Sequence, residues 1–219
     1  MNLRIGNTAP DFEAKTTIGR IRFHEWIGND WCILFSHPKD FTPVCTTELG
    51  SMAKLNSEFT RRGCKVMGLG VDPVSSHMEW SHDIGAFAGA LPDYPIIGDD
   101  DLRVCKLYGM LPASEKAGPE IRTAEQNATV RSVFIIDPEK TIRLIIAYPM
   151  TCGRNFHEIL RALDSLQLSE KHTLSTPSDW VDGEDVLLPY AWTDEQAKEF
   201  YPDGWYAPMP YLRFVPQPK

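Results

Sequence analysis

The sequence predicts an α/β fold in which helices flank a mixed β-sheet, and three observations indicate this class. Two short apolar runs, residues 31–35 and 66–71, have the length and residue types of buried strands. Residues 49–59 between them place apolar side chains at spacings of three and four, which is typical of an amphipathic helix. Residues 132–136 and 141–148 are β-rich runs that follow one another closely, as in a β-hairpin. Strands that alternate with helices and end in a hairpin favour a layered α/β fold.

The remaining elements of the first half follow from the same patterns. Residues 8–12 are expected to be irregular, and residues 20–23 alternate like a short edge strand. Residues 75–87 are expected to form a helix, residues 94–98 a third buried strand and residues 101–110 another helix. The apolar anchors of the first of these two helices are Met78, Trp80 and Ile84.

The second half contains a loop, a helix and a tail of different composition. Residues 111–127 lack a clear period and are expected to be a loop, and a helix begins at residues 155–158 in the style of a capping box. Beyond about Ser169 the chain is rich in proline but also in tryptophan and tyrosine. Disordered tails are poor in aromatic residues, so we expect this tail to pack against a surface. We therefore divide the chain into a domain of residues 1–168 and an extension of residues 169–219.

The composition is that of an ordinary globular protein, with 42% hydrophobic and 24% charged residues. The net charge of −8 argues against nucleic acid or an anionic membrane as a standing partner. No apolar run approaches the roughly 18 residues of a transmembrane helix, so we expect no stable membrane insertion. Residues 1–6 are not followed by the apolar stretch of a secretory signal. We therefore expect a cytoplasmic, reducing location.

Five cysteines are scattered along the chain, and one of them is placed differently from the others. Cys32, Cys64 and Cys105 lie in apolar surroundings and are expected to be small core residues. Thr42 followed by proline is typical of a helix N-cap with proline at the first helical position, which places Cys45 in the first turn. Unpaired N–H groups and the helix dipole favour an anion there. A thiol in that position loses its proton more readily, and the thiolate is the nucleophile.

The residues around Cys45 also carry a resemblance to a known family. The pattern Pro38-x-x-x-Thr42-x-x-Cys45 resembles the active-site signature of the peroxiredoxins, which are thiol peroxidases on a thioredoxin-like fold. The longer run HPKDFTPVCTTEL, residues 37–49, and the run YPMTCGRNFHEILR, residues 148–161, are similar to the one-cysteine branch of that family. Because the resemblance covers nearly the whole chain, it implies a thioredoxin-like domain with a C-terminal extension that crosses onto a partner subunit.

The resemblance also implies a set of site residues. Cys45 would be the peroxidatic cysteine, Arg131 the guanidinium that stabilises negative charge, and Thr42 a hydroxyl donor toward sulfur or peroxide. Pro38 would shape and shield the pocket. The supporting residues would be Glu48, Arg154 and His37, the first two as an ion-pair network that orients the arginine. Without the resemblance, Arg131 and Arg154 would be interpreted as surface charges.

The implied reaction needs neither cofactor nor metal. The thiolate would reduce hydrogen peroxide and organic hydroperoxides and become a sulfenic acid. Cys152, two residues from Arg154, could in principle be a resolving thiol, but its spacing matches no known pairing and no cysteine follows it in the sequence. We therefore expect an external reductant: glutathione, another thiol or ascorbate. A homodimer is expected, because the β-rich run 141–148 is suited to pair at a sheet edge.

Two other functions remain open from the sequence. One is a redox sensor or chaperone in which oxidation of Cys45 switches a surface. The other is lipid hydrolysis, since some one-cysteine relatives carry a Gly-x-Ser-x-Gly site with a histidine and an aspartate. Here the matching residues 28–32 place Asp30 at the serine position, and Glu139 stands where the aspartate would be. His24 then has no hydroxyl to activate, so we expect no phospholipase activity.

Overall fold

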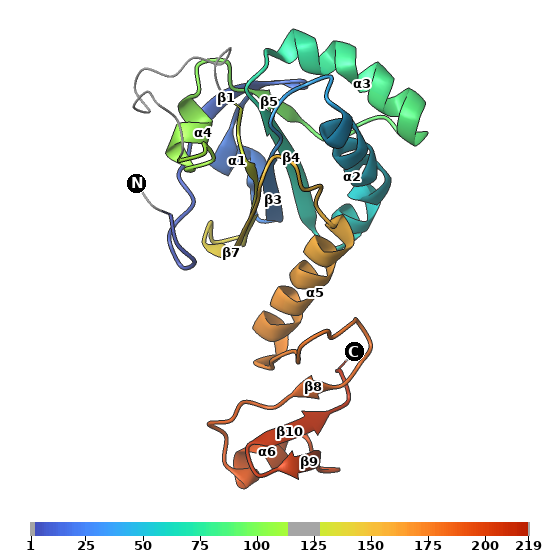
Figure 1. Ribbon diagram of the computed structural model, residues 1–219. Helices are drawn as coiled ribbons and strands as arrows, with labels where there is room; N and C mark the ends of the chain where they lie inside the picture. The colour runs from blue at the N-terminus through green and yellow to red at the C-terminus, as the bar shows by residue number, and fades with distance from the viewer. Residues whose placement is uncertain (1–2, 114–127, 219) are drawn as a thin grey trace. The chain divides into compact units, whose positions relative to one another are not determined.

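The computed structural model describes residues 3–113 and 128–218, which form two compact units, Met1–Phe156 and His157–Lys219 (Figure 1). Most of the predicted loop at residues 111–127 lies outside the described residues. Among the described residues, no helix combines the length and the apolar character needed to cross a membrane.

The first unit is built on a seven-stranded sheet in the order β2-β1-β5-β4-β3-β6-β7. The strands are β1 Glu13–Thr16, β2 Gly19–Arg22, β3 Trp31–Ser36, β4 Cys64–Gly70, β5 Ile96–Gly98, β6 Arg131–Ile136 and β7 Ile142–Tyr148. The central strands β3, β4 and β5 are parallel, whereas β6 and β7 form an antiparallel hairpin beside β3. The sheet is therefore mixed, which confirms the predicted fold class, and β7 lies at its edge.

Helices cover both faces of this sheet. They are α1 Phe23–Ile27, α2 Pro43–Arg61, α3 Val74–Ala88 and α4 Arg103–Leu107. In Figure 1, α2 and α3 lie together on one face, and α1 and α4 lie on the other. A buried apolar cluster joins α1 and α4 to the strands, with Phe23, Ile27, Val104 and Cys105 among its members.

Local details differ from the sequence predictions in three places. Strand β1 and helix α1 were not predicted, because neither is long enough to show a period. Helix α4 is shorter than the predicted helix at residues 101–110. Met78 is 56% exposed and is not an anchor of α3, whereas the other two predicted anchors, Trp80 and Ile84, are buried together with His77. These three residues lie on one helical face at spacings of three and four, whereas Met78 is turned away from it.

The second unit has a small core of its own. After α5, Phe156–His172, which starts at the last residue of the first unit, the chain forms β8 Val186–Leu187, α6 Asp194–Phe200, β9 Tyr206–Met209 and β10 Leu212–Val215. The three strands pair in the order β8-β10-β9. Trp180 is fully buried in this unit, whereas Tyr190 is 87% and Tyr211 71% exposed. The tail is thus folded, and it presents aromatic side chains on its surface.

Candidate active site

The loop between β3 and α2 positions Cys45. Strand β3 ends at Ser36, and α2 begins at Pro43 with Thr42 as its N-cap in extended conformation. The Thr42 hydroxyl donates to the Lys39 carbonyl at 2.8 Å rather than accepting from the helix, so it fixes the loop and not the helix end. Cys45 is the third residue of α2 and is fully buried. The first-turn placement predicted from the sequence is confirmed.

Arg131 brings a positive charge to the thiol. Its side chain starts at the first residue of β6 and is almost fully buried. One terminal nitrogen, Nη1, lies 3.3 Å from Cys45 Sγ and 2.6 Å from a carboxylate oxygen of Glu48. The Nε of Arg131 donates to the Met150 carbonyl at 2.9 Å. These contacts hold the guanidinium plane against the sulfur.

Glu48 joins two buried arginines. Arg154 donates from Nε and Nη2 to the two carboxylate oxygens at 2.9 and 2.7 Å, and its backbone N–H adds a third bond at 2.8 Å. Burial acts to raise the pKa of Glu48, but the hydrogen bonds and charge of Arg154, together with the charge of Arg131, hold it below its ordinary value. One carboxylate faces two guanidiniums, so the group keeps a net positive charge beside Cys45. This charge lies where negative charge would develop on the sulfur during a reaction of Cys45.

The other predicted residues lie in the same loop. Pro38 is buried directly after His37, and Thr42 is half-buried at the helix start. Pro38 and Thr42 therefore lie in the loop, and Cys45 follows in the first turn of α2, all within eight residues of the chain. The structure brings Cys45, Arg131, Glu48 and Arg154 into direct contact.

Sequence reasoning missed two side chains near the site, Asp40 and His77. Asp40 Oδ1 lies 2.8 Å from His37 Nε2, and Asp40 Oδ2 lies 2.7 Å from His77 Nδ1. The spacing of His77, Trp80 and Ile84 along α3 was the signal that could have identified the buried histidine. Within the described chain, the ligand atoms of His37, Asp40 and His77 lie within 4.8 Å of one another, so this is a group with donors suited to a metal. Its atoms are already satisfied largely by hydrogen bonds to each other.

The remaining cysteines divide into buried and exposed. Cys32, Cys64 and Cys105 are in the interior, and burial raises the pKa of each thiol. For Cys105, the nearby Asp99 raises it further. Such thiols are unreactive. Cys152 is exposed.

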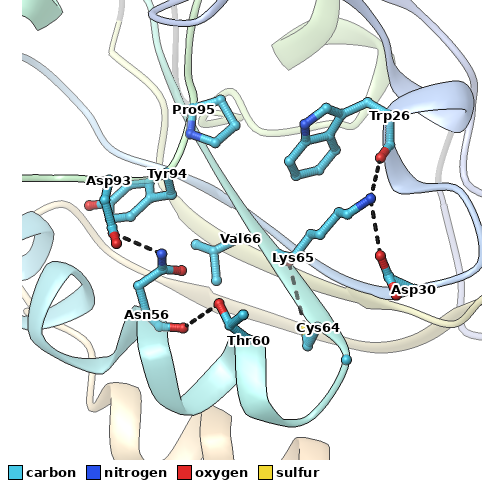
Figure 2. A pocket seen from close by; sticks show the side chains of 11 residues that line it. Trp26, Asp30, Asn56, Thr60, Cys64, Lys65, Val66, Asp93, Tyr94 and Pro95 are labelled. Carbon is cyan, nitrogen blue, oxygen red and sulfur yellow. Dashed lines mark hydrogen bonds and ion pairs between the residues drawn. The ribbon is translucent and has the colours of Figure 1, made fainter.

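A separate cavity of about 380 Å³ lies where β3 and β4 begin, whereas Cys45 follows the other end of β3. Figure 2 shows Lys65 reaching across this cavity, where its Nζ lies 2.7 Å from the Trp26 carbonyl and 3.0 Å from Asp30. Asp30 is therefore paired with a cation. His24 Nε2 contacts the Ala9 carbonyl at 2.8 Å, which gives that histidine a structural partner.

Comparisons with known proteins agree with this geometry. The sequence matches the AhpC/TSA family over residues 5–145 and the C-terminal domain of 1-Cys peroxiredoxin over residues 165–204. It is 48% identical over 225 residues to Peroxiredoxin-6 of Rattus norvegicus, covering 99% of this chain and 98% of that one.

Two solved structures are similar over nearly their whole length. A cysteine-to-serine mutant of the peroxiredoxin 6 of Arenicola marina superposes with a TM-score of 0.89 at 42% identity, covering 100% of both chains. A yeast mitochondrial 1-Cys peroxiredoxin, described for its thiol resolving mechanism via the glutathione and thioredoxin systems, gives 0.87 at 44% identity and covers 98% of this chain and 99% of that one.

Proposed function

The chain belongs to the AhpC/TSA family, in its 1-Cys peroxiredoxin branch, and is a thiol-dependent peroxidase, in which we propose that Cys45 is the peroxidatic residue. The observation that carries this assignment is the 3.3 Å contact between Arg131 Nη1 and Cys45 Sγ in a buried, positively charged pocket. Among the five cysteines, Cys45 alone combines a helix start with a guanidinium contact in the described structure.

In the proposed reaction the Cys45 thiolate attacks one peroxide oxygen. The sulfur–oxygen bond forms as the O–O bond breaks, and the second oxygen leaves as hydroxide or alkoxide and takes up a proton. Arg131 stabilises the negative charge on sulfur and then on the leaving oxygen. Glu48 and Arg154 hold Arg131 in place. Thr42, whose hydroxyl donates to the Lys39 carbonyl in this structure, is proposed to turn that hydroxyl toward the sulfur or the peroxide when substrate binds, and Pro38 is proposed to shield the pocket from water.

The product on the enzyme is a sulfenic acid, which an outside reductant returns to the thiol. We propose hydrogen peroxide and organic hydroperoxides as oxidants, and glutathione, another thiol or ascorbate as reductant. A thiol condenses with the sulfenic acid to a mixed disulfide and water, and a second thiol releases Cys45. The yeast relative, which is described with the glutathione and thioredoxin systems, supports an external thiol. Because Cys45 must be reduced between turnovers, we propose a reducing compartment such as the cytoplasm.

A peroxide-consumption assay with each reductant in turn tests this function. Sustained turnover with at least one reductant is expected. A single equivalent of peroxide consumed per Cys45 with every reductant would instead favour a redox sensor.

We propose that residues 1–168 form the peroxidase domain and that the protein is a homodimer in which residues 169–219 cross onto the partner. Two observations support the dimer: β7 is an edge strand, and the second unit carries exposed aromatic side chains such as Tyr190 and Tyr211. Uncovered edges of this kind are commonly protected by pairing.

Ala147→Lys is expected to weaken this dimer, because Ala147 is exposed in β7 and a lysine on an edge strand opposes pairing. Light scattering at micromolar concentration measures the mass of the variant beside the wild type. Ala86→Lys on helix α3 is the control, since Ala86 is also exposed but lies away from the edge. A wild-type protein that scatters as a monomer contradicts the proposed assembly.

Purified protein is expected to release no fatty acid from phospholipid vesicles. Asp30 stands at the position of a nucleophilic serine and pairs with Lys65, and an aspartate there would repel the developing oxyanion. His24 contacts the Ala9 carbonyl instead of a hydroxyl group. The measurement is fatty-acid release by wild type and by His24→Ala. Release that disappears in the variant would contradict this expectation and assign His24 a role in lipid hydrolysis.

A further inference from the structure

The first turn of α2, which carries Cys45, lacks the groups that usually support the start of a helix. Pro43 has no backbone N–H to donate. Within the described chain, the Thr42 side chain makes no hydrogen bond to the helix and no acidic residue lies in the first turn. A carboxylate there would also repel negative charge on the Cys45 sulfur. Uncharged contacts from elsewhere in the fold therefore have to hold this turn.

Thr46, the residue after Cys45, provides such a contact. Its hydroxyl donates to the Thr42 carbonyl at 2.8 Å, and its backbone N–H donates to the same carbonyl at 3.0 Å. The same hydroxyl oxygen accepts a hydrogen bond from Trp80 Nε1 at 3.2 Å. One oxygen atom thus joins the N-cap residue of α2 to a side chain of the neighbouring helix α3.

Trp80 is a rigid donor for this hydrogen bond. Its side chain is fully buried in α3, which lies beside α2 (Figure 1). The indole also packs near Phe41, with ring centroids 6.2 Å apart. Phe41 has a φ of 52°, which bulky residues rarely adopt and which persists only where the surrounding structure fixes it. Trp80 thus contacts the chain on both sides of the point where α2 begins.

We propose that Thr46 is a positioning residue, held by Trp80, whose hydroxyl fixes the first turn of α2 so that the Cys45 sulfur meets Arg131. The proposal rests on the peroxidatic role assigned to Cys45 above. Cys45 lies between Thr42 and Thr46, the two residues that the hydroxyl joins. Movement of this turn therefore moves the sulfur.

Arg131 has supports of its own and would not follow such a movement. Its guanidinium is held by Glu48, which lies beyond the first turn of α2, and by the Met150 carbonyl. The 3.3 Å distance between Arg131 Nη1 and Cys45 Sγ is therefore set by two separate groups of contacts. Loss of the Thr46 hydroxyl would loosen the contacts of the sulfur and leave those of the guanidinium in place.

Two reactions of Cys45 depend differently on this distance. Oxidation by peroxide needs the sulfur and the guanidinium together, because negative charge develops on the leaving oxygen. In alkylation by iodoacetamide, the sulfur displaces iodide, which needs neither a proton nor a neighbouring cation to leave. Both reactions use the thiolate, so the ratio of their rate constants cancels the thiolate fraction and reports the placement of the sulfur at Arg131.

Thr46→Val removes the hydroxyl and keeps the shape of the side chain. We expect the ratio of oxidation to alkylation to fall roughly tenfold. Thr46→Ser keeps the hydroxyl and should restore the ratio to within about twofold of the wild type. Quenched-flow mass spectrometry of the peptide that contains Cys45 gives both rate constants, so the exposed Cys152 does not contribute.

Thr47→Val is the matched control. Thr47 is exposed in the same turn, and its hydroxyl donates to the Val44 carbonyl at 2.7 Å, whereas no hydrogen bond from α3 reaches it in the described structure. This variant should keep the wild-type ratio. Trp80→Phe retains an aromatic ring without the Nε1–H and should lower the ratio as Thr46→Val does. The double variant should be no lower than Thr46→Val alone, because both substitutions remove the same hydrogen bond.

The Thr46 variants decide the proposal without any substitution in the core. A wild-type ratio in Thr46→Val overturns it, and so does a low ratio in Thr46→Ser or in Thr47→Val. Additive losses in the double variant overturn the part assigned to Trp80. The peroxidatic role of Cys45 is decided separately, by the turnover of Cys45→Ser.

Discussion

Cys45→Ser is expected to abolish peroxide turnover, with a loss of more than about 1,000-fold in rate. A serine hydroxyl at the start of α2 is not deprotonated by the helix dipole and the neighbouring guanidinium, and it is a poor nucleophile toward peroxide oxygen. The substitution changes one buried atom, so the fold and its thermal unfolding temperature should be close to those of the wild type. Turnover with hydrogen peroxide and a thiol reductant is the measurement.

The controls for this substitution are the other cysteines. Cys152→Ser replaces an exposed thiol and should leave turnover largely intact. Cys32→Ala, Cys64→Ala and Cys105→Ala remove buried thiols whose pKa is raised, so they should affect stability more than activity. A fully active Cys45→Ser protein contradicts the proposed site. A Cys152→Ser protein that stalls as a sulfenic acid would assign a resolving role to Cys152.

The sequence predicted the parts of the fold that have a clear period. Strands β3 and β4, helix α2 and the β6–β7 hairpin were found close to their predicted positions because each is long and strongly patterned. Strand β1 and helix α1 are held by tertiary contacts, such as the stacking of Phe12 on Phe23, and have no local signal.

Only part of the candidate site could be predicted from the sequence. The first-turn position of Cys45 follows from local rules, namely a Thr-Pro helix start. The approach of Arg131, 86 residues away in the chain, does not, since only the tertiary fold brings the first residue of β6 to that helix. The spacing of His77, Trp80 and Ile84 could have shown that His77 is buried, but not that it contacts Asp40, because only the tertiary fold brings the two side chains together.

Arg131→Ala is expected to slow the oxidation of Cys45 by peroxide roughly a hundredfold or more in rate constant. The protein is expected to stay folded. The arginine is preorganised by Glu48 and by the Met150 carbonyl, so its charge meets the developing charge on the leaving oxygen without reorganisation. When the Arg131 side chain is removed, the Glu48 carboxylate keeps its hydrogen bonds to Arg154, so it is not left without a partner. Stopped-flow tryptophan fluorescence during oxidation gives the rate constant.

Arg131→Lys distinguishes charge from geometry in the same experiment. A lysine keeps the positive charge, but its single ammonium cannot reproduce the planar set of donors that contacts the sulfur, Glu48 and the Met150 carbonyl together. We therefore expect Arg131→Lys to recover only part of the rate lost in Arg131→Ala, and both variants to unfold close to the wild-type temperature. Unchanged oxidation in Arg131→Ala would remove this arginine from the site, and full recovery by lysine would show that charge alone is enough.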